Sequence, residues 1–170
     1  MRVFAFSVLA LTAGCQSIPA DAPGASASLQ PTKGSSVRGT VNFAQIGDKV
    51  RITANVTGLK PGGEFGFHVH EAGDCSSGDG MSTKGHFNPL GRAHAHHGTT
   101  ERHAGDLPSL KSDGSGNASL SIDLDVITVA AGPTSIVGRG LIVHAQPDDF
   151  KTQPTGNAGA RSACAVIQRS

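Results

Sequence analysis

The sequence predicts an all-β protein with the architecture of an antiparallel Greek-key sandwich or barrel. Several segments alternate apolar and polar residues with a period of two, which buries one face of a strand and exposes the other. The 23 glycines and 9 prolines supply the turns that many short strands need. No segment shows the 3.6-residue apolar period over the length of a helix.

The composition limits the class of protein. A chain of 170 residues has room for one domain and a tail. It carries 14 basic and 13 acidic side chains, a net charge of +1, whereas a general nucleic-acid binder would show a basic excess. Because Trp and Tyr are absent, the core must come from aliphatic residues and 7 Phe. We therefore expect one globular domain that does not bind nucleic acid.

The N-terminal stretch MRVFAFSVLALTAGC is typical of an export signal, with Arg2 followed by an uncharged run too short to span a bilayer. We expect residues 1–14 to be a signal peptide. LTAGC resembles a bacterial lipobox, which predicts a lipid on Cys15; cleavage among residues 18–25 is the alternative. The protein is expected to be exported to the periplasm or cell envelope, with membrane contact only through this lipid.

Residues 15–36 are rich in Ala, Ser and Pro and lack apolar periodicity. This composition predicts a flexible tether, because it buries too little apolar surface to fold. The tether would hold a folded domain, residues 37–170, away from a membrane surface.

Alternation and turn residues predict the strands of this domain. The predicted strands are 37–43, 50–57, 65–70, 120–126, 136–144 and 162–167. Two long connections, residues 71–118 and 145–160, separate them, and the first carries five of the 8 His. Loops of this length are uncommon unless they are functional or disordered, so we expect both to be functional.

The segment GFHVHEAGDC contains two histidines, His68 and His70, that a strand places on one face. They can converge on one ion while the intervening apolar residues face the core. Further candidate ligands follow along the chain: His86, His94, His103, Asp106 and His144. Imidazole suits Zn, Cu, Fe and Ni, and carboxylate joins it readily on Zn, so the sequence predicts a metal site.

Five motifs occur in an order that resembles the copper–zinc superoxide dismutase family. They are GFHVHEAGDC (66–75), GHFNPLGRAH (85–94), ERHAGDLP (101–108), GRGLIVHAQPDD (138–149) and GNAGARSACAVI (156–167). Together they cover most of residues 37–170. The resemblance implies a bacterial exported enzyme with Cu and Zn as cofactors and the superoxide anion as substrate.

The resemblance also implies the ligands of each metal. Copper would be bound by His68, His70, His86 and His144, and zinc by His86, His94, His103 and Asp106. A four-nitrogen set suits tetragonal Cu(II), and a filled set of three nitrogens and one oxygen suits a structural zinc. The shared His86 would lose both ring protons, which two divalent cations favour. Asp148 would link His68 to His94 and fix both rings.

Two cysteines remain in the expected mature domain, Cys75 and Cys164. An even count in an exported protein predicts a disulfide, and the resemblance agrees. A redox-active thiol is the rival interpretation, although the chain has no CxxC.

The resemblance places Arg161 beside the copper channel, where a guanidinium could hold a small anion. An arginine packed on loop backbone is the alternative, and both can be true. Lys84 and Lys151 can add to a positive funnel, but the sequence does not place them. His96 and His97 have no role in the family; they are either exposed loop residues or a weak additional metal site.

The expected function is dismutation of superoxide to dioxygen and hydrogen peroxide, in defence of the cell envelope. In the mechanism that the resemblance implies, one superoxide reduces Cu(II) and a second reoxidises Cu(I). His86 and water supply the protons, and Arg161 attracts the anion. A metal store or copper carrier, and an anchored interaction protein, are the competing hypotheses. The sequence leaves the oligomeric state open between monomer and homodimer.

Overall fold

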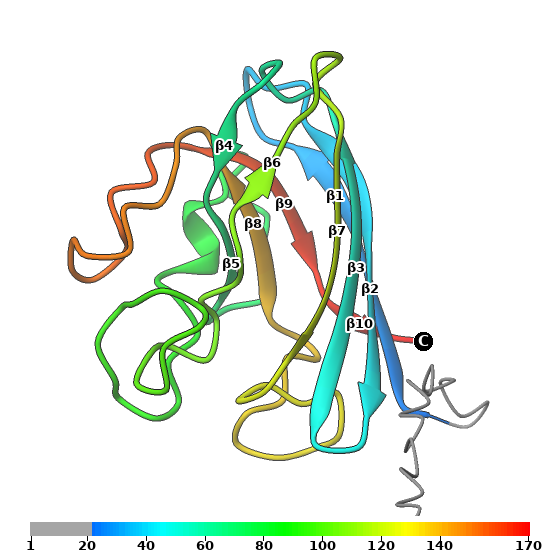
Figure 1. Cartoon of the computed structure of the whole chain (residues 1–170). Helices are drawn as coiled ribbons and strands as arrows, with labels where there is room; N and C mark the ends of the chain where they lie inside the picture. The colour runs from blue at the N-terminus through cyan, green and yellow to red at the C-terminus, as the bar shows by residue number, and fades with distance from the viewer. Residues whose placement is uncertain (1–21) are drawn as a thin grey trace, which may run out of the picture.

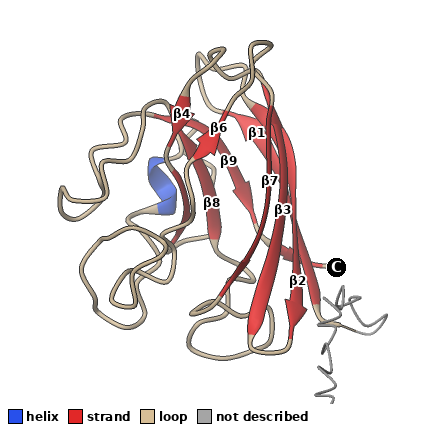
Figure 2. Ribbon diagram, in the orientation of Figure 1, coloured by secondary structure: helices blue, strands red, loops and turns tan. Residues whose placement is uncertain are grey.

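The computed structural model describes residues 22–170, and almost all of its regular structure is antiparallel β-sheet (Figures 1 and 2). The strands are β1 (Gly24–Pro31), β2 (Arg38–Ile46), β3 (Lys49–Thr57), β4 (Glu64–Phe65), β5 (Phe67–His70), β6 (Leu110–Lys111), β7 (Ala118–Leu124), β8 (Gly140–His144), β9 (Arg161–Val166) and β10 (Gln168–Arg169). One 3-10 turn, η1 (Met81–Thr83), is the only helical element in this part of the chain. Across residues 22–170 no helix has the length and apolarity to cross a membrane. The prediction of an all-β fold is confirmed.

The main sheet has the strand order β5-β8-β9-β1-β2-β3-β7, and β10 pairs with β1. All pairs of named strands are antiparallel, including the small second sheet of β4 and β6. The chain crosses from β3, which lies next to the β7 end of this order, to β5 at the other end, and it returns from β7 to β8. The sheet curls so that β5 and β8 face β2 and β3 (Figure 1).

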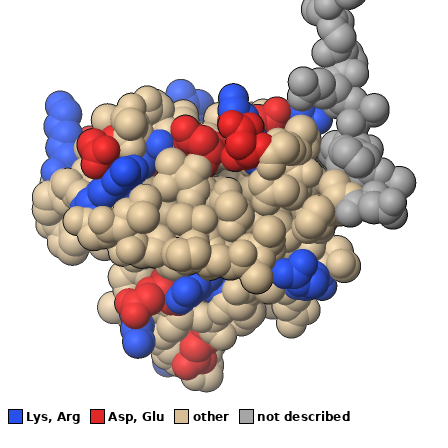
Figure 3. Space-filling view, turned by 90° about the horizontal axis from the view of Figure 1, so that it is seen from below, with Lys and Arg blue, Asp and Glu red and all other residues tan. Residues whose placement is uncertain are grey.

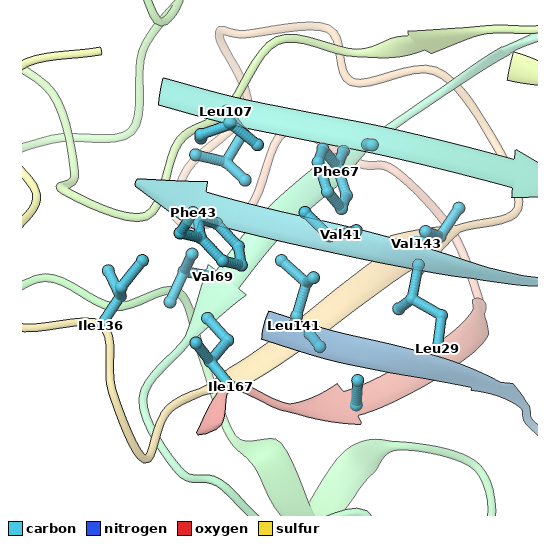
Figure 4. Packing of buried hydrophobic residues seen from close by; sticks show 14 of the residues in the cluster. Leu29, Val41, Phe43, Phe67, Val69, Leu107, Ile136, Leu141, Val143 and Ile167 are labelled. Carbon is cyan, nitrogen blue, oxygen red and sulfur yellow. The ribbon is translucent and has the colours of Figure 1, made fainter. Parts of the chain in front are cut away.

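The core lies between these two halves of the curled sheet. Phe43 of β2, Phe67 of β5 and Leu141 of β8 are all at most 2% exposed, and they point toward one another (Figure 4). Burying one such side chain contributes roughly 1.5–3 kcal/mol. The core therefore fixes β5, the strand that carries two of the candidate ligands.

Strand β1 corrects the prediction of a flexible tether over residues 15–36. Ala25, Ala27 and Leu29 are buried in the core, and β1 pairs with β2 from Gly24 to Leu29. Alanine gives a weak hydrophobic signal, so the Ala, Ser and Pro composition concealed a period-two pattern. The folded domain therefore begins by Gly24, not at residue 37.

The predictions for residues 1–21 lie outside the described residues. They comprise the signal peptide, lipidation of Cys15 and the first part of the tether.

The other predicted strands agree with the structure to within a few residues, with two exceptions. The segment 65–70 is divided between two sheets, because Phe65 belongs to β4 and β5 begins at Phe67. The segment 136–144 becomes a strand only at Gly140, because Gly138 has φ +79° and the Arg139 N–H donates to the Ile136 carbonyl in a turn. The two-residue strands β6 and β10 carry too few residues for a period to be visible.

Both long connections lie outside β5 and β8, on the same side of the molecule (Figure 1). Acidic and basic side chains are interspersed on the face drawn in Figure 3, with a wide uncharged band between them. That face therefore carries no extended patch of one sign.

Candidate metal centre

Strand β5 directs His68 and His70 away from the core and under the loop that follows. Phe67 and Val69 face the core, and all four residues are fully buried. The Val69 N–H donates to the Gly105 carbonyl at 3.0 Å, so the loop runs alongside β5 as an extra edge. Only glycine fits at 105, because a Cβ there would lie 2.2 Å from the Val69 oxygen.

The same pairing brings residues of the loop opposite the two histidines of β5. His70 pairs with His86, and His68 pairs with Asp106, in isolated antiparallel bridges. The Phe87 N–H donates to the Val69 carbonyl at 2.8 Å and fixes this register. Residues 16 and 38 positions apart in the chain therefore share one buried site.

The first donor cluster consists of four buried imidazoles. One ligand atom from each ring lies within 4.8 Å of the others; the rings belong to His68, His70, His86 and His144. Each ring has one buried nitrogen without a hydrogen-bond partner: Nδ1 of His68 and Nε2 of the other three. Four unpartnered nitrogens in one enclosed space would be costly unless an ion occupied it.

Hydrogen bonds fix the tautomers of three of these rings. His70 Nδ1 donates to the Lys84 carbonyl at 2.9 Å, and His144 Nδ1 donates to the Gly159 carbonyl at 3.2 Å. His68 Nε2 lies 2.7 Å from Asp148 Oδ2. The proton is thereby held on the nitrogen that faces away from the cluster, which leaves a lone pair on the nitrogen that faces inward.

The second donor cluster gathers around the carboxylate of Asp106. Nδ1 of His86 and Nδ1 of His94 each lie 2.9 Å from Asp106 Oδ1, and His103 Nδ1 lies 3.4 Å from it. The other carboxylate oxygen accepts the N–H groups of Ala95 and His103, both at 3.1 Å. Three nitrogens and one oxygen, all buried, form the donor set of a filled tetrahedral zinc site.

One ring, His86, belongs to both clusters. Its Nδ1 faces Asp106 and its unpartnered Nε2 faces the four-nitrogen cluster. An imidazole bonded through both nitrogens carries no ring proton, and two divalent cations stabilise that anion. The residues present therefore fit copper in the first cluster and zinc in the second.

Burial keeps the first cluster ready to bind a metal at neutral pH. Desolvation lowers the pKa of His144 to about 3 and that of His86 to about 4, and it also lowers the pKa values of His68 and His70. Neutral imidazole is the form that donates a lone pair. These rings are therefore neutral at pH 7, with one nitrogen free to donate a lone pair, before any metal arrives.

Two carboxylates set the charge of the second cluster. Burial opposes ionisation of Asp106 and Asp148, but hydrogen bonds from the histidine rings outweigh it and hold both pKa values well below the usual range. Burial alone would lower the pKa of His94, yet hydrogen bonds to these carboxylates raise it to about 9. A metal must therefore displace a proton from His94, so its affinity should fall as the pH drops below about 9.

Asp148 joins the two clusters from the second long loop. Its Oδ2 lies 2.7 Å from His68 Nε2 and its Oδ1 lies 2.9 Å from His94 Nε2. Gly156 packs directly on this contact, and a Cβ there would lie 1.8 Å from Asp148 Oδ1. The expected link between His68 and His94 is thus present as a geometry, and it fixes the orientation of both rings.

Arg161 reaches from β9 into the loop that carries η1. It donates through Nη1 to the Gly80 carbonyl and to Thr83 Oγ1, and through Nη2 to the Lys84 carbonyl at 2.6 Å. That same carbonyl accepts from His70 Nδ1. The guanidinium is therefore packed on loop backbone, and it also lies one carbonyl group away from a ring of the first cluster.

Lys84 adopts a backbone conformation, φ 63° and ψ −145°, that is unfavourable for any residue with a Cβ. This conformation turns its carbonyl inward to Arg161 and His70, while the ammonium lies outside, 3.9 Å from Glu71. Lys84, whose backbone is strained, is thus the residue that joins the arginine to the first cluster.

We expect Lys84→Gly to stabilise the protein by about 1 kcal/mol, because relief of strain exceeds the entropy cost of glycine. The exposed contact with Glu71 contributes little. Chemical denaturation at fixed metal content measures the change. Lys151→Gly is the control, since Lys151 is exposed and has no positive φ, and it should destabilise. Equal destabilisation by both substitutions would contradict the inference that the backbone of Lys84 is strained.

His96 and His97 belong to neither cluster. Their ring centroids lie 3.9 Å apart, and the His96 ring contacts Phe150 edge to face at 4.8 Å. Within residues 22–170, every group of three or more closely spaced donors is one of the two clusters already described. Lys151, the other lysine considered for a positive funnel, is exposed.

The disulfide between Cys75 and Cys164 is present, as expected. It ties the loop before η1 to β9, and the two cysteines are 89 residues apart in the sequence. Because both sulfurs are in the bond, neither is a free thiol. The bond anchors the loop whose carbonyl groups hold Arg161.

Sequence reasoning did not identify two residues that the structure places at the site, Thr83 and Gln153. Thr83 is fully buried and accepts from Arg161, and Gln153 bonds the backbone of His94. No local pattern marks either residue, because each acts on a partner more than 50 positions away.

A curled antiparallel sheet that carries two adjoining buried donor clusters with a shared imidazole defines a dinuclear metalloprotein. A family model described as copper/zinc superoxide dismutase (SODC) matches residues 37–167. The chain therefore belongs to the copper/zinc superoxide dismutase family, and the resemblance seen in its motifs is confirmed.

Similar proteins agree with this membership. Superoxide dismutase [Cu-Zn] of Paramecium bursaria Chlorella virus 1 is 43% identical over 77% of this chain and 72% of its own length. Superoxide dismutase [Cu-Zn] 2 of Aquifex aeolicus is 38% identical over 85% of this chain and 86% of its own length. Superoxide dismutase [Cu-Zn] 2 of Brassica juncea is 46% identical over 77% of this chain and 89% of its own length. Among solved structures, the clock protein EA4 has a TM-score of 0.79 at 40% identity and covers 86% of this chain and 94% of its own.

Proposed function

We propose that this protein is a superoxide dismutase that binds copper in the four-nitrogen cluster and zinc in the cluster around Asp106. The observation that carries the proposal is His86, which presents one ring nitrogen to each cluster. The reaction consumes two superoxide anions and two protons and yields one dioxygen and one hydrogen peroxide. Bound copper would supply the one-electron redox chemistry, and zinc would hold the shared ring in place.

The residues of the chain perform the remaining tasks. Arg161 supplies a permanent positive charge beside the first cluster and attracts the anion. Nε2 of His86 can hold a proton and release it toward the developing peroxide, while water delivers the second proton. Asp106 and Asp148 hold the rings of both clusters in fixed orientations.

The direct test is a superoxide-scavenging assay on metal-free protein reloaded with copper and zinc together or with either metal alone. We expect activity only in samples that contain copper, and inhibition by cyanide, which binds copper. Activity that persists without copper would contradict the assignment. Copper bound at full stoichiometry without turnover would favour the metal store instead.

The role of Arg161 makes a separate prediction. We expect Arg161→Gln to lower the second-order rate with superoxide by about 10-fold and to flatten its dependence on salt, because attraction of the anion weakens. The matched control is Arg38→Gln, which removes an exposed arginine from β2. Rates measured from low to physiological ionic strength decide the issue. An unchanged salt dependence would show that Arg161 only packs on the loop.

We also propose that the protein is exported and carries a lipid on Cys15 in the cell envelope. Two observations support this: the lipobox-like LTAGC, and the Cys75–Cys164 disulfide, which is typical of oxidising compartments. Defence of the envelope against superoxide would follow from that position.

Mass spectrometry of the mature N-terminus tests the anchor. We expect a diacylglyceryl group on Cys15, and release of the protein from membranes by Cys15→Ser. A mature N-terminus that begins within residues 18–25, without lipid, would contradict the anchor but leave export intact.

A further inference from the structure

The side chain of Gln153 bonds the main chain of His94, a residue of the other long loop. Gln153 Oε1 accepts the His94 N–H at 2.8 Å, and Gln153 Nε2 donates to the His94 carbonyl at 2.8 Å. A further donation from Nε2 to the Lys151 carbonyl at 3.3 Å steadies the amide. One exposed side chain thus forms hydrogen bonds with both the main-chain N–H and the main-chain carbonyl of a buried residue.

No other protein group within residues 22–170 bonds the His94 main chain. The next fixed point is the Ala95 N–H, which donates to Asp106 Oδ2. His94 itself is 2% exposed, whereas Gln153 is exposed and lies outside the core. Gln153 therefore holds the main chain of His94 in place through its two hydrogen bonds more than through packing.

The second long loop holds His94 at two places. Asp148 bonds the His94 ring at Nε2, and Gln153, five residues later, bonds the His94 main chain. With both ends held, Nδ1 points at Asp106. The orientation of the His94 ring is fixed only if its main chain is also fixed. Rotation about the main chain would move Nδ1 even while Nε2 stays hydrogen-bonded to Asp148.

We propose that Gln153 is a positioning residue for the zinc site: its clamp on His94 sets how long the zinc ion is retained. The proposal rests on the assignment of His94 to the zinc set. His94 is not a member of the four-nitrogen cluster, so the clamp acts on zinc and leaves copper retention nearly unchanged. Outer partners of metal ligands typically contribute 10–100-fold to affinity.

The test uses Gln153→Met, which keeps the length of the side chain and removes both hydrogen bonds. Lys151→Ala is the control, since it alters the same loop but keeps the Lys151 carbonyl that Gln153 contacts. Each protein is loaded with copper and zinc, and the release of each metal to a chromogenic chelator is followed separately. The visible spectrum of Co(II) placed in the zinc site reports the ligand geometry.

We expect Gln153→Met to release zinc about 10-fold faster than the parent protein. Copper release should stay within about twofold, and the Co(II) bands should shift. Lys151→Ala should match the parent in all three measurements. Equal zinc release and an unshifted spectrum in Gln153→Met would overturn the proposal, as would equal acceleration of zinc and copper release, which indicates general loosening. If the parent protein itself holds no zinc, the proposed function fails, and this result is distinct from the others.

Discussion

His144→Ala is expected to abolish copper-dependent activity, with a loss of more than about 100-fold. His144 supplies one of four inward-facing nitrogens and is the only member of the cluster that comes from β8. Its removal leaves three donors and an opening in a buried site. Activity and bound copper, measured on the same reloaded sample, should fall together, while zinc content stays near that of the parent protein.

The control is His96→Ala, which removes an exposed histidine that belongs to neither cluster. Its activity and both metal contents should equal those of the parent protein. A His144→Ala protein that retains copper at full stoichiometry and remains active would contradict the ligand assignment.

Loss of the disulfide is expected to be the largest change in stability. Closing a loop of 89 residues with a covalent bond contributes about 4–5 kcal/mol by the chain-entropy estimate. For a domain of this size, the double substitution of Cys75 and Cys164 by serine should lower the unfolding midpoint by roughly 15 °C. Differential scanning calorimetry of the metal-free proteins measures this shift of the midpoint without a contribution from metal binding.

The same substitution should also lower activity, because the disulfide anchors the loop that holds Arg161. The single variant Cys164→Ser separates the effect of a free thiol from the loss of the bond. Both variants should show the same midpoint and the same reduced activity. A midpoint within a few degrees of the parent protein would show that the loop is held by its hydrogen bonds instead.

Much of the metal centre could be predicted because ligands are specified by residue type and local spacing. His68 and His70 share a strand face by the geometry of β-structure alone. The ligand sets were implied by the family resemblance that motifs in short segments carry, and the structure brings all seven candidate ligand side chains into two clusters. Asp148 also lies where the resemblance implied.

Other features depend on contacts between distant segments and could not be predicted. Strand β1 was hidden because Ala25 and Ala27 give almost no hydrophobic signal, although both are buried between neighbouring strands. The roles of Gln153 and Lys84 depend on main-chain groups, which have no sequence signature. Gln153 meets His94 across 59 positions, and the inward carbonyl of Lys84 requires a backbone conformation that its residue type disfavours.

The central claim is that one imidazole, that of His86, joins two different metal ions. Diffraction from crystals of the loaded protein, recorded at the copper and zinc absorption edges, tests it most directly. We expect copper among His68, His70, His86 and His144, zinc among His86, His94, His103 and Asp106, and the ring of His86 bonded to both. Ions bound elsewhere, or a His86 ring bonded to only one of them in the oxidised protein, would contradict the account.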